Sequence, residues 1–230
     1  FTKNKMLATN SYLKANKIKI FPNTIDPYFQ LPTQFYKPDY LLKRYGIDKH
    51  TKVLLTVTRL ANTEQFKGYD YVIESLSKIS KKDNISIKYL IGGKGQTEEV
   101  NRIENLIQQH KAQEQVQLLG FIKDEELIDH YLLADVFVMP SKKEGFGIVF
   151  IEAAACGCKV IAGNKDGSVD ALQNGELGTL INPDSVEDLE QAILENLNNN
   201  NHNPATLQQK VVSSFGFPVF KERLKQYLNA

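Results

Sequence analysis

Cysteine is scarce in this sequence, with two residues among 230. Cys156 and Cys158 stand two positions apart in a segment of small residues, which is poor disulfide geometry and at most half of a metal site. We therefore interpret both as small, buried apolar side chains in a reducing compartment. This excludes a disulfide framework as the source of stability.

An excess of charge of one sign is also absent, because the formal net charge is +1. Such a balance predicts no bulk attraction to nucleic acid or to an anionic membrane. No apolar run has the length of a transmembrane helix, and the first residues lack the pattern of a secretory signal peptide. With 42% hydrophobic and 24% charged residues, we expect a soluble, cytoplasmic chain with one sizeable core.

Regular alternation of short apolar runs with helical periodicity begins at Asp39. Helices are predicted at 67–82, around 103–107, and at 124–133, 185–197 and 218–228. Strands are predicted at 53–58, 85–91, 116–119, 135–139, 159–162 and 177–181. Six strands alternating with helices predict an α/β fold with a doubly wound, parallel, Rossmann-like sheet.

The first 36 residues differ from the rest in composition, because prolines interrupt any period between positions 22 and 38. Here the sequence predicts a weak helix at 3–16 and a short alternating strand at 17–21. We expect residues 1–36 to be the end of a preceding domain and the linker that follows it, and residues 37–230 to be the domain, ending in its C-terminal helix. The chain starts at Phe1 rather than Met, so we expect it to be part of a longer polypeptide.

The stretch 140–152 is the centre of the functional prediction. It follows the buried strand at 135–139 and precedes small residues that end in Gly157, which suits a helix C-terminus. Gly145 and Gly147 allow the backbone to approach a ligand closely. Free N–H groups at the start of the following helix favour an anion such as phosphate.

Two acidic residues, Glu144 and Glu152, flank this stretch with seven residues between them. Along a helix that spacing is about 12 Å of rise, too long for one metal ion or one proton shuttle. Carboxylates accept hydrogen bonds from hydroxyl groups. The pattern therefore favours an extended ligand with phosphate in the middle and hydroxyls at both ends, such as a nucleotide sugar.

Cationic side chains come next to another predicted strand end. Arg59 follows the strand at 53–58, and Lys67 opens the next helix. A guanidinium binds phosphate in a bidentate manner and an ammonium acts as a point charge, so the pair could hold a diphosphate without metal. The alternative is a pair of surface cations on a solvated loop.

Two weaker signals follow further strand ends. The turn that contains Gly93 and Gly95 lacks the third glycine of a dinucleotide fingerprint and the Lys-Ser/Thr of a P-loop, so it is either a ligand contact or a simple tight turn. Phe121 and Ile122, after the strand at 116–119, could form an apolar shelf for a base. A phenylalanine at the edge of the core is the alternative.

These segments together resemble the nucleotide-sugar-binding domain of the retaining GT-B glycosyltransferases of the large group-one (family-four) type. The resemblance covers about 17–228, and its most specific part is the motif with two glutamates. The motifs that carry it are Phe21-Pro22-Asn23-Thr24-Ile25-Asp26, Thr58-Arg59-Leu60, Lys67-Gly68, Gly93-Lys94-Gly95, Leu119-Gly120-Phe121, Pro140-Ser141-x-x-Glu144-Gly145-Phe146-Gly147 and Glu152-Ala153. Two departures are a longer loop from Arg59 to Lys67 and Asp170 in place of the usual glutamate.

The resemblance implies one half of a GT-B fold and a set of residue roles. Arg59 and Lys67 would bind the donor diphosphate as the leaving group, and Glu144 would contact the sugar hydroxyls. Glu152 would bind the ribose, and Phe121 and Ile122 would border the base. Backbone groups of Gly145, Phe146, Gly147 and Ile148 would face the sugar and phosphates, with Gly93 and Gly95 near the donor.

The implied reaction transfers a hexose from a nucleoside-diphosphate sugar with retention, without metal or other cofactor. The absence of an Asp-x-Asp triplet agrees with that, because a metal-held diphosphate needs clustered carboxylates. The acceptor, a glycan, lipid or other molecule, would bind mainly to the family's first domain, which would also supply any contact with the inner membrane face. Without that domain, we expect donor binding and no turnover. A sugar-nucleotide epimerase, a phosphorylase and a non-catalytic nucleotide-binding module stay open as alternatives.

Overall fold

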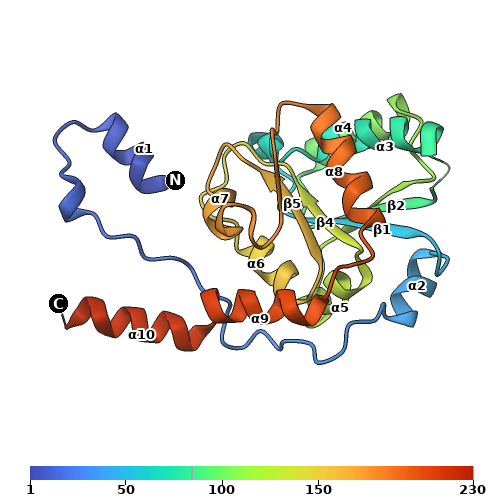
Figure 1. The fold of residues 1–230 in the computed structure, drawn as a ribbon. Coiled ribbons are helices and arrows are strands. Elements are labelled where there is room, and N and C mark those ends of the chain that lie inside the picture. Colours follow the sequence, from blue (N-terminus) through green and yellow to red (C-terminus); the bar gives the residue numbers. More distant parts are fainter. Residues whose placement is uncertain (84, 230) are drawn as a thin grey trace.

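The centre of the fold is a six-stranded parallel sheet with the strand order β3-β2-β1-β4-β5-β6 (Figure 1). The computed structural model describes residues 1–83 and 85–229. The strands are β1 (Lys52–Val57), β2 (Ile87–Gly92), β3 (Val116–Gly120), β4 (Val136–Met139), β5 (Lys159–Gly163) and β6 (Thr179–Ile181). The six strands and the doubly wound parallel sheet predicted from the sequence are therefore confirmed.

Helices cover both faces of this sheet (Figure 1). One face packs against α3 (Tyr69–Asp83), α4 (Thr97–Gln109) and α8 (Val186–Asn198). The opposite face packs against α2 (Asp39–Tyr45), α5 (Asp124–Leu133), α6 (Ile148–Ala155) and α9 (Pro204–Phe215). The shorter elements are α1 (Thr2–Thr9), α7 (Ser168–Ala171), α10 (Phe217–Leu228) and the 3₁₀ helices η1 (Ala15–Lys17), η2 (Asn62–Lys67) and η3 (Gln173–Gly175).

Burial on both faces explains why the central strands are nearly continuous apolar runs. All four residues of β4 are buried, and so are the four middle residues of β1. A strand between two helical layers has no solvent face, so it loses the apolar/polar alternation of a half-exposed strand. Because buried strands form continuous apolar runs, residues 53–58 and 135–139 could be recognised as strands from the sequence.

The predictions for the first 21 residues were partly wrong. Helix α1 ends at Thr9 rather than extending to position 16, and residues 17–21 join none of the sheet's strands. Instead, Phe21 packs against α10, with its ring centroid 4.8 Å from that of Phe220 and 5.5 Å from that of Tyr227. An alternating pattern forms a strand only where a neighbouring strand satisfies its backbone, and here the neighbour is a helix.

Three helices, α2, α7 and α9, were not predicted from the sequence. Helix α9 follows an asparagine-rich loop and begins where the Asn203 side chain accepts a hydrogen bond from the Thr206 N–H, 3.0 Å away. Pro204 occupies its first position, which is favourable for a helix start. The helix buries Val211 and Phe215 against the sheet face that also carries α6.

Contacts with the core of the domain begin before residue 37. Ile25 is buried in the core, and its N–H donates to the Phe215 carbonyl at 2.9 Å. The domain boundary itself stays a prediction. Within the part of the chain that the structure describes, the helices are too short or too polar to cross a bilayer.

Candidate functional site

A cleft of about 1180 Å³ opens at the carboxyl end of the sheet. Its inner wall is formed by the segments that follow β1 and β4, which are neighbours in the sheet although they are far apart in the chain. The strand order reverses direction between these two strands, and open α/β sheets bind their ligands at that switch point. Of the predicted site residues, Arg59, Lys67 and Glu144 through Ile148 line this cleft.

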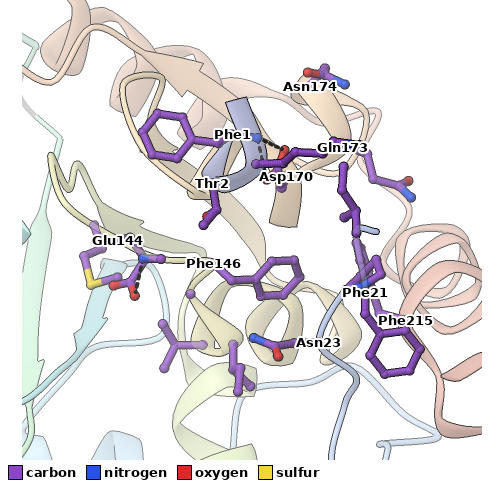
Figure 2. A pocket seen from close by; sticks show the side chains of 18 of the residues that line it. Phe1, Thr2, Phe21, Asn23, Glu144, Phe146, Asp170, Gln173, Asn174 and Phe215 are labelled. Atoms are coloured by element: carbon purple, nitrogen blue, oxygen red, sulfur yellow. Dashed lines mark hydrogen bonds and ion pairs between the residues drawn. The ribbon is translucent and has the colours of Figure 1, made fainter. Parts of the chain in front are cut away.

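The far wall of the cleft comes from other parts of the chain. Figure 2 shows the Phe146 ring pointing toward Phe21 and Phe215, with Glu144 on the other side of it and Gln173 and Asn174 in the upper part of the view; all six residues line the cleft. Asp170, which stands where the family usually has glutamate, also lines the cleft.

Lys67 and Glu144 form the central ion pair of the cleft. The Lys67 ammonium nitrogen lies 2.5 Å from a Glu144 carboxylate oxygen, and both side chains are mostly buried, with 14% and 18% exposed. The two residues are 77 positions apart and belong to different βα loops. The cation after β1 and the acid after β4 therefore meet in the structure.

Arg59 has a different acidic partner. Its guanidinium forms an ion pair with Glu64, five positions along the same loop. The Glu64 side chain is 13% exposed, whereas that of Arg59 is 72% exposed. Glu64 was not among the residues predicted from the sequence, although its position between Arg59 and Lys67 is the available signal. Both predicted phosphate-binding cations are thus paired with a carboxylate.

The loop that carries Glu144 is fixed by Asp166, which is 1% exposed. One Asp166 oxygen accepts the Glu144 N–H at 2.7 Å, and the other accepts the Ser168 N–H at 2.9 Å. In return, the Glu144 carbonyl accepts the Gly167 N–H at 2.7 Å. A Cβ at Gly167 would lie 2.0 Å from the Gly145 carbonyl oxygen, so only glycine permits this contact. Asp166 is a positioning residue that no motif in the sequence marked.

Gly147 completes the loop and leads into α6. It adopts φ +84°, and a Cβ there would lie 2.4 Å from the Phe150 ring. Glycine is required for this left-handed conformation at the helix start. No side chain caps α6, so N–H groups of its first turn are available at the cleft.

The segment that carries Lys67, η2, is fixed from the opposite side by Glu99, which is 1% exposed. Gln65 donates to Glu99 at 3.2 Å, and Arg102 donates to it through two guanidinium nitrogens. Burial acts to raise the pKa of Glu99, but the hydrogen bonds from Arg102, Tyr69 and Gln65 outweigh it and hold that pKa below its ordinary value. Glu99 is therefore an anionic anchor for the Lys67 segment.

Five predicted site residues do not line the cleft, and four of them lie on loops that follow β2 and β3. Gly93 bonds to the Gly120 carbonyl at 2.7 Å, and Gly95 pairs with Leu60 in a parallel bridge, so both hold neighbouring loops together. Ile122 is buried, and Phe121 is 69% exposed outside the cleft wall. Their assignment to the donor base stays a prediction.

Glu152 is also turned away from the cleft. Its carboxylate accepts a hydrogen bond from the Tyr131 hydroxyl at 3.0 Å. Burial raises the pKa of Glu152, and the hydrogen bond from Tyr131 offsets part of that effect. From the spacing of Glu144 and Glu152 in the sequence, we predicted that both acids contact one extended ligand. In the structure, only Glu144 lines the cleft. The ribose role of Glu152 stays a prediction.

Metal ligands are not clustered in residues 1–83 and 85–229, where three or more histidine, cysteine or acidic side chains do not gather in a metal-binding arrangement. The two cysteines are buried, and burial raises the pKa of both thiols, to about 12 for Cys158. They are inert core residues, as the sequence analysis expected.

Comparison with known proteins identifies relatives of this chain. The family model for "Glycosyl transferases group 1" matches residues 40–210. An uncharacterised glycosyltransferase of Methanocaldococcus jannaschii is 32% identical over 175 residues, which cover 74% of this chain and 43% of that protein. A GDP-mannose-dependent phosphatidylinositol monomannoside mannosyltransferase of Mycobacterium tuberculosis is 30% identical over 175 residues, with coverage of 71% and 44%. The chain thus spans less than half the length of these relatives.

Solved structures show the same fold. A glycosyltransferase of Rickettsia africae superposes with a TM-score of 0.82 at 24% identity, covering 97% of this chain and 60% of that one. HepE of Anabaena, crystallised with UDP and glucose, superposes with a TM-score of 0.82 at 18% identity, covering 99% and 60%. The Rossmann-like fold of this chain is therefore shared with these solved glycosyltransferase structures. With the family model matching most of its length, the chain belongs to the group 1 glycosyl transferases.

Proposed function

We propose that this chain binds the nucleotide-sugar donor of an enzyme that transfers a hexose with retention and without metal. The observation that carries the proposal is the meeting of Arg59, Lys67 and Glu144 in one cleft at the switch point of the sheet. Cations suit a diphosphate and a carboxylate suits sugar hydroxyls. Relatives that use GDP-mannose or bind UDP support this choice of ligand.

In this proposal each group has a defined role. Arg59 and Lys67 bind the diphosphate and stabilise its charge as the leaving group departs, while Glu144 accepts hydrogen bonds from the sugar. The first N–H groups of α6 approach the phosphates. Glu152, Phe121 and Ile122 would have to turn toward the nucleoside, because they lie outside the cleft wall. The acceptor and any contact with the cytoplasmic membrane face belong to other parts of a longer protein.

Thermal unfolding with UDP, GDP and ADP tests donor binding. A nucleotide present at about 100 times its dissociation constant should stabilise the chain by about 2.7 kcal/mol. Arg59→Gln and Lys67→Gln should each weaken binding about tenfold or more, because a charge-assisted contact to phosphate is lost. The exposed Lys210→Gln on α9 is the control and should bind normally.

Incubation with the hexose esters of the same nucleotides tests catalysis. We expect this chain to bind a nucleotide sugar without transferring the sugar, since acceptor groups lie elsewhere. If none of the nucleotides raises the melting temperature of the wild type, the cleft is not a donor site. If a nucleotide does bind, product analysis with a longer protein that contains this chain separates a retaining transferase from an epimerase or a phosphorylase.

A further inference from the structure

We infer that Glu64 makes the cleft prefer an intact nucleotide sugar over the nucleoside diphosphate that remains after transfer. This inference rests on the proposed donor function and adds a selectivity residue to it. Glu64 was not part of the predicted site. It lines the same cleft as Arg59, Lys67 and Glu144.

The charges at the switch-point end of the cleft cancel. Arg59 pairs with Glu64, and Lys67 pairs with Glu144, so these four side chains sum to zero. A phosphate group can reach the Arg59 guanidinium only in competition with the Glu64 carboxylate. The ligand therefore replaces one ion pair by another, and the displaced acid stays beside the incoming phosphate.

The structure indicates which partner of the Arg59–Glu64 pair stays in place. Glu64 is 13% exposed and Arg59 is 72% exposed, so the guanidinium has the room to move. The turn that holds Glu64 is fixed at several points. The Glu64 N–H donates to the Ala61 carbonyl at 2.8 Å, and the Lys142 N–H donates to the Phe66 carbonyl at 3.0 Å. Gln65 is tied to the buried Glu99.

The two ligands differ in charge at the terminal phosphate. In a nucleotide sugar, each phosphate is esterified and carries one negative charge. In the free nucleoside diphosphate the terminal phosphate carries no ester and is held only by its anhydride bond, so it can lose a second proton with a pKa of about 6 and carries close to one charge more at about pH 8. Repulsion from a fixed carboxylate grows with ligand charge. Glu64 should therefore disfavour the diphosphate more than its sugar ester, which promotes product release.

Calorimetric titration at about pH 8 tests this inference with UDP, GDP and ADP and their glucose and mannose esters. For the nucleotide that the wild type binds, Glu64→Gln should tighten the diphosphate about tenfold and the sugar ester by clearly less. Glu64→Asp keeps the charge and should retain most of the wild-type preference. Glu114→Gln, on an exposed turn before β3, is the matched control and should change neither affinity.

The outcomes are distinguishable. A higher affinity of Glu64→Gln for the diphosphate, with a smaller gain for the ester, supports the selectivity role. Equal changes for both ligands, or weaker binding of both, would overturn it, because the acid would then only position the loop. If neither the wild type nor Glu64→Gln binds any of the nucleotides, the donor function itself fails, and the selectivity role fails with it.

Discussion

At the residue scale, the cleft is a set of compensated charges held by buried acids. Lys67 and Arg59 each face a carboxylate. Glu99 fixes the segment that carries Lys67, and Asp166 fixes the loop that carries Glu144. A ligand anion must therefore exchange with internal ion pairs, which limits how tightly a bare phosphate can bind. The buried acids accept backbone or side-chain hydrogen bonds, so they set the geometry without facing the ligand.

Asp166→Ala should destabilise the chain by about 2 to 4 kcal/mol, because the N–H groups of Glu144 and Ser168 would lose their acceptors in a buried position. Asp166→Asn keeps one acceptor oxygen and should therefore lower the free energy of unfolding by less than Asp166→Ala does. Urea unfolding measures both, with the exposed Glu114→Ala as the control. If Asp166→Ala lowers the free energy of unfolding by no more than the control does, the hydrogen bonds of Asp166 are not needed for stability.

At the element scale, the position of α6 depends on α9. The two helices pack against each other, and Gln208 of α9 donates to the Ala155 carbonyl at the end of α6, at 2.8 Å. Phe215 of α9 also packs edge-on to Phe146 in the cleft loop, with ring centroids 5.5 Å apart. Helix α9, which was not predicted from the sequence, thus supports the loop at 140–147, on which the functional prediction was centred.

Asn203→Ala should destabilise the chain by about 1 kcal/mol, because it removes the side-chain cap on the Thr206 N–H at the start of α9. The exposed Asn200→Ala in the preceding loop is the matched control and should have little effect. Urea midpoints compare the two variants. Equal midpoints would indicate that solvent satisfies the start of α9 as well as Asn203 does.

At the scale of the whole molecule, stability should fall in mild acid. Burial lowers the pKa of His130, whose Nδ1 donates to the Glu126 carbonyl and whose Nε2 lies 2.8 Å from the Tyr45 hydroxyl. Burial also lowers the pKa of His202. The unfolded chain binds these protons near pH 6.5, before the folded chain does, so the stabilisation is complete above about pH 6.5 and is lost as the pH falls below it.

Urea unfolding at about pH 7.5 and about pH 5.5 measures this effect, which is at most about 1.4 kcal/mol per pH unit for each histidine. His130→Asn should show a smaller difference between the two pH values than the wild type. The exposed His50→Asn should keep the wild-type difference. If the free energy of unfolding of His130→Asn depends on pH as strongly as that of the wild type, His130 does not contribute to that dependence.

Prediction from the sequence succeeded where the signal is local. The sheet lies between two helical layers, so apolar runs were enough to find its strands. Because the strands are parallel, the loops after β1 and β4 could be placed at the same edge of the sheet. It failed for residues 17–21, whose alternating pattern packs on α10 instead of a strand. For Glu152 the spacing was correct, but the side chain turns to Tyr131. A spacing fixes distance along the chain and not the direction of a side chain.

The order of strands and glycine-rich turns by itself determined the doubly wound sheet and brought Arg59, Lys67 and Glu144 to one edge. Only the tertiary structure decided their partners: Lys67 with Glu144, Arg59 with Glu64, and Asp166 beneath the Glu144 loop. Backbone periodicity is encoded within a few residues. Pairing of charges depends on how loops up to 77 positions apart pack against one another, and on which acids that packing buries.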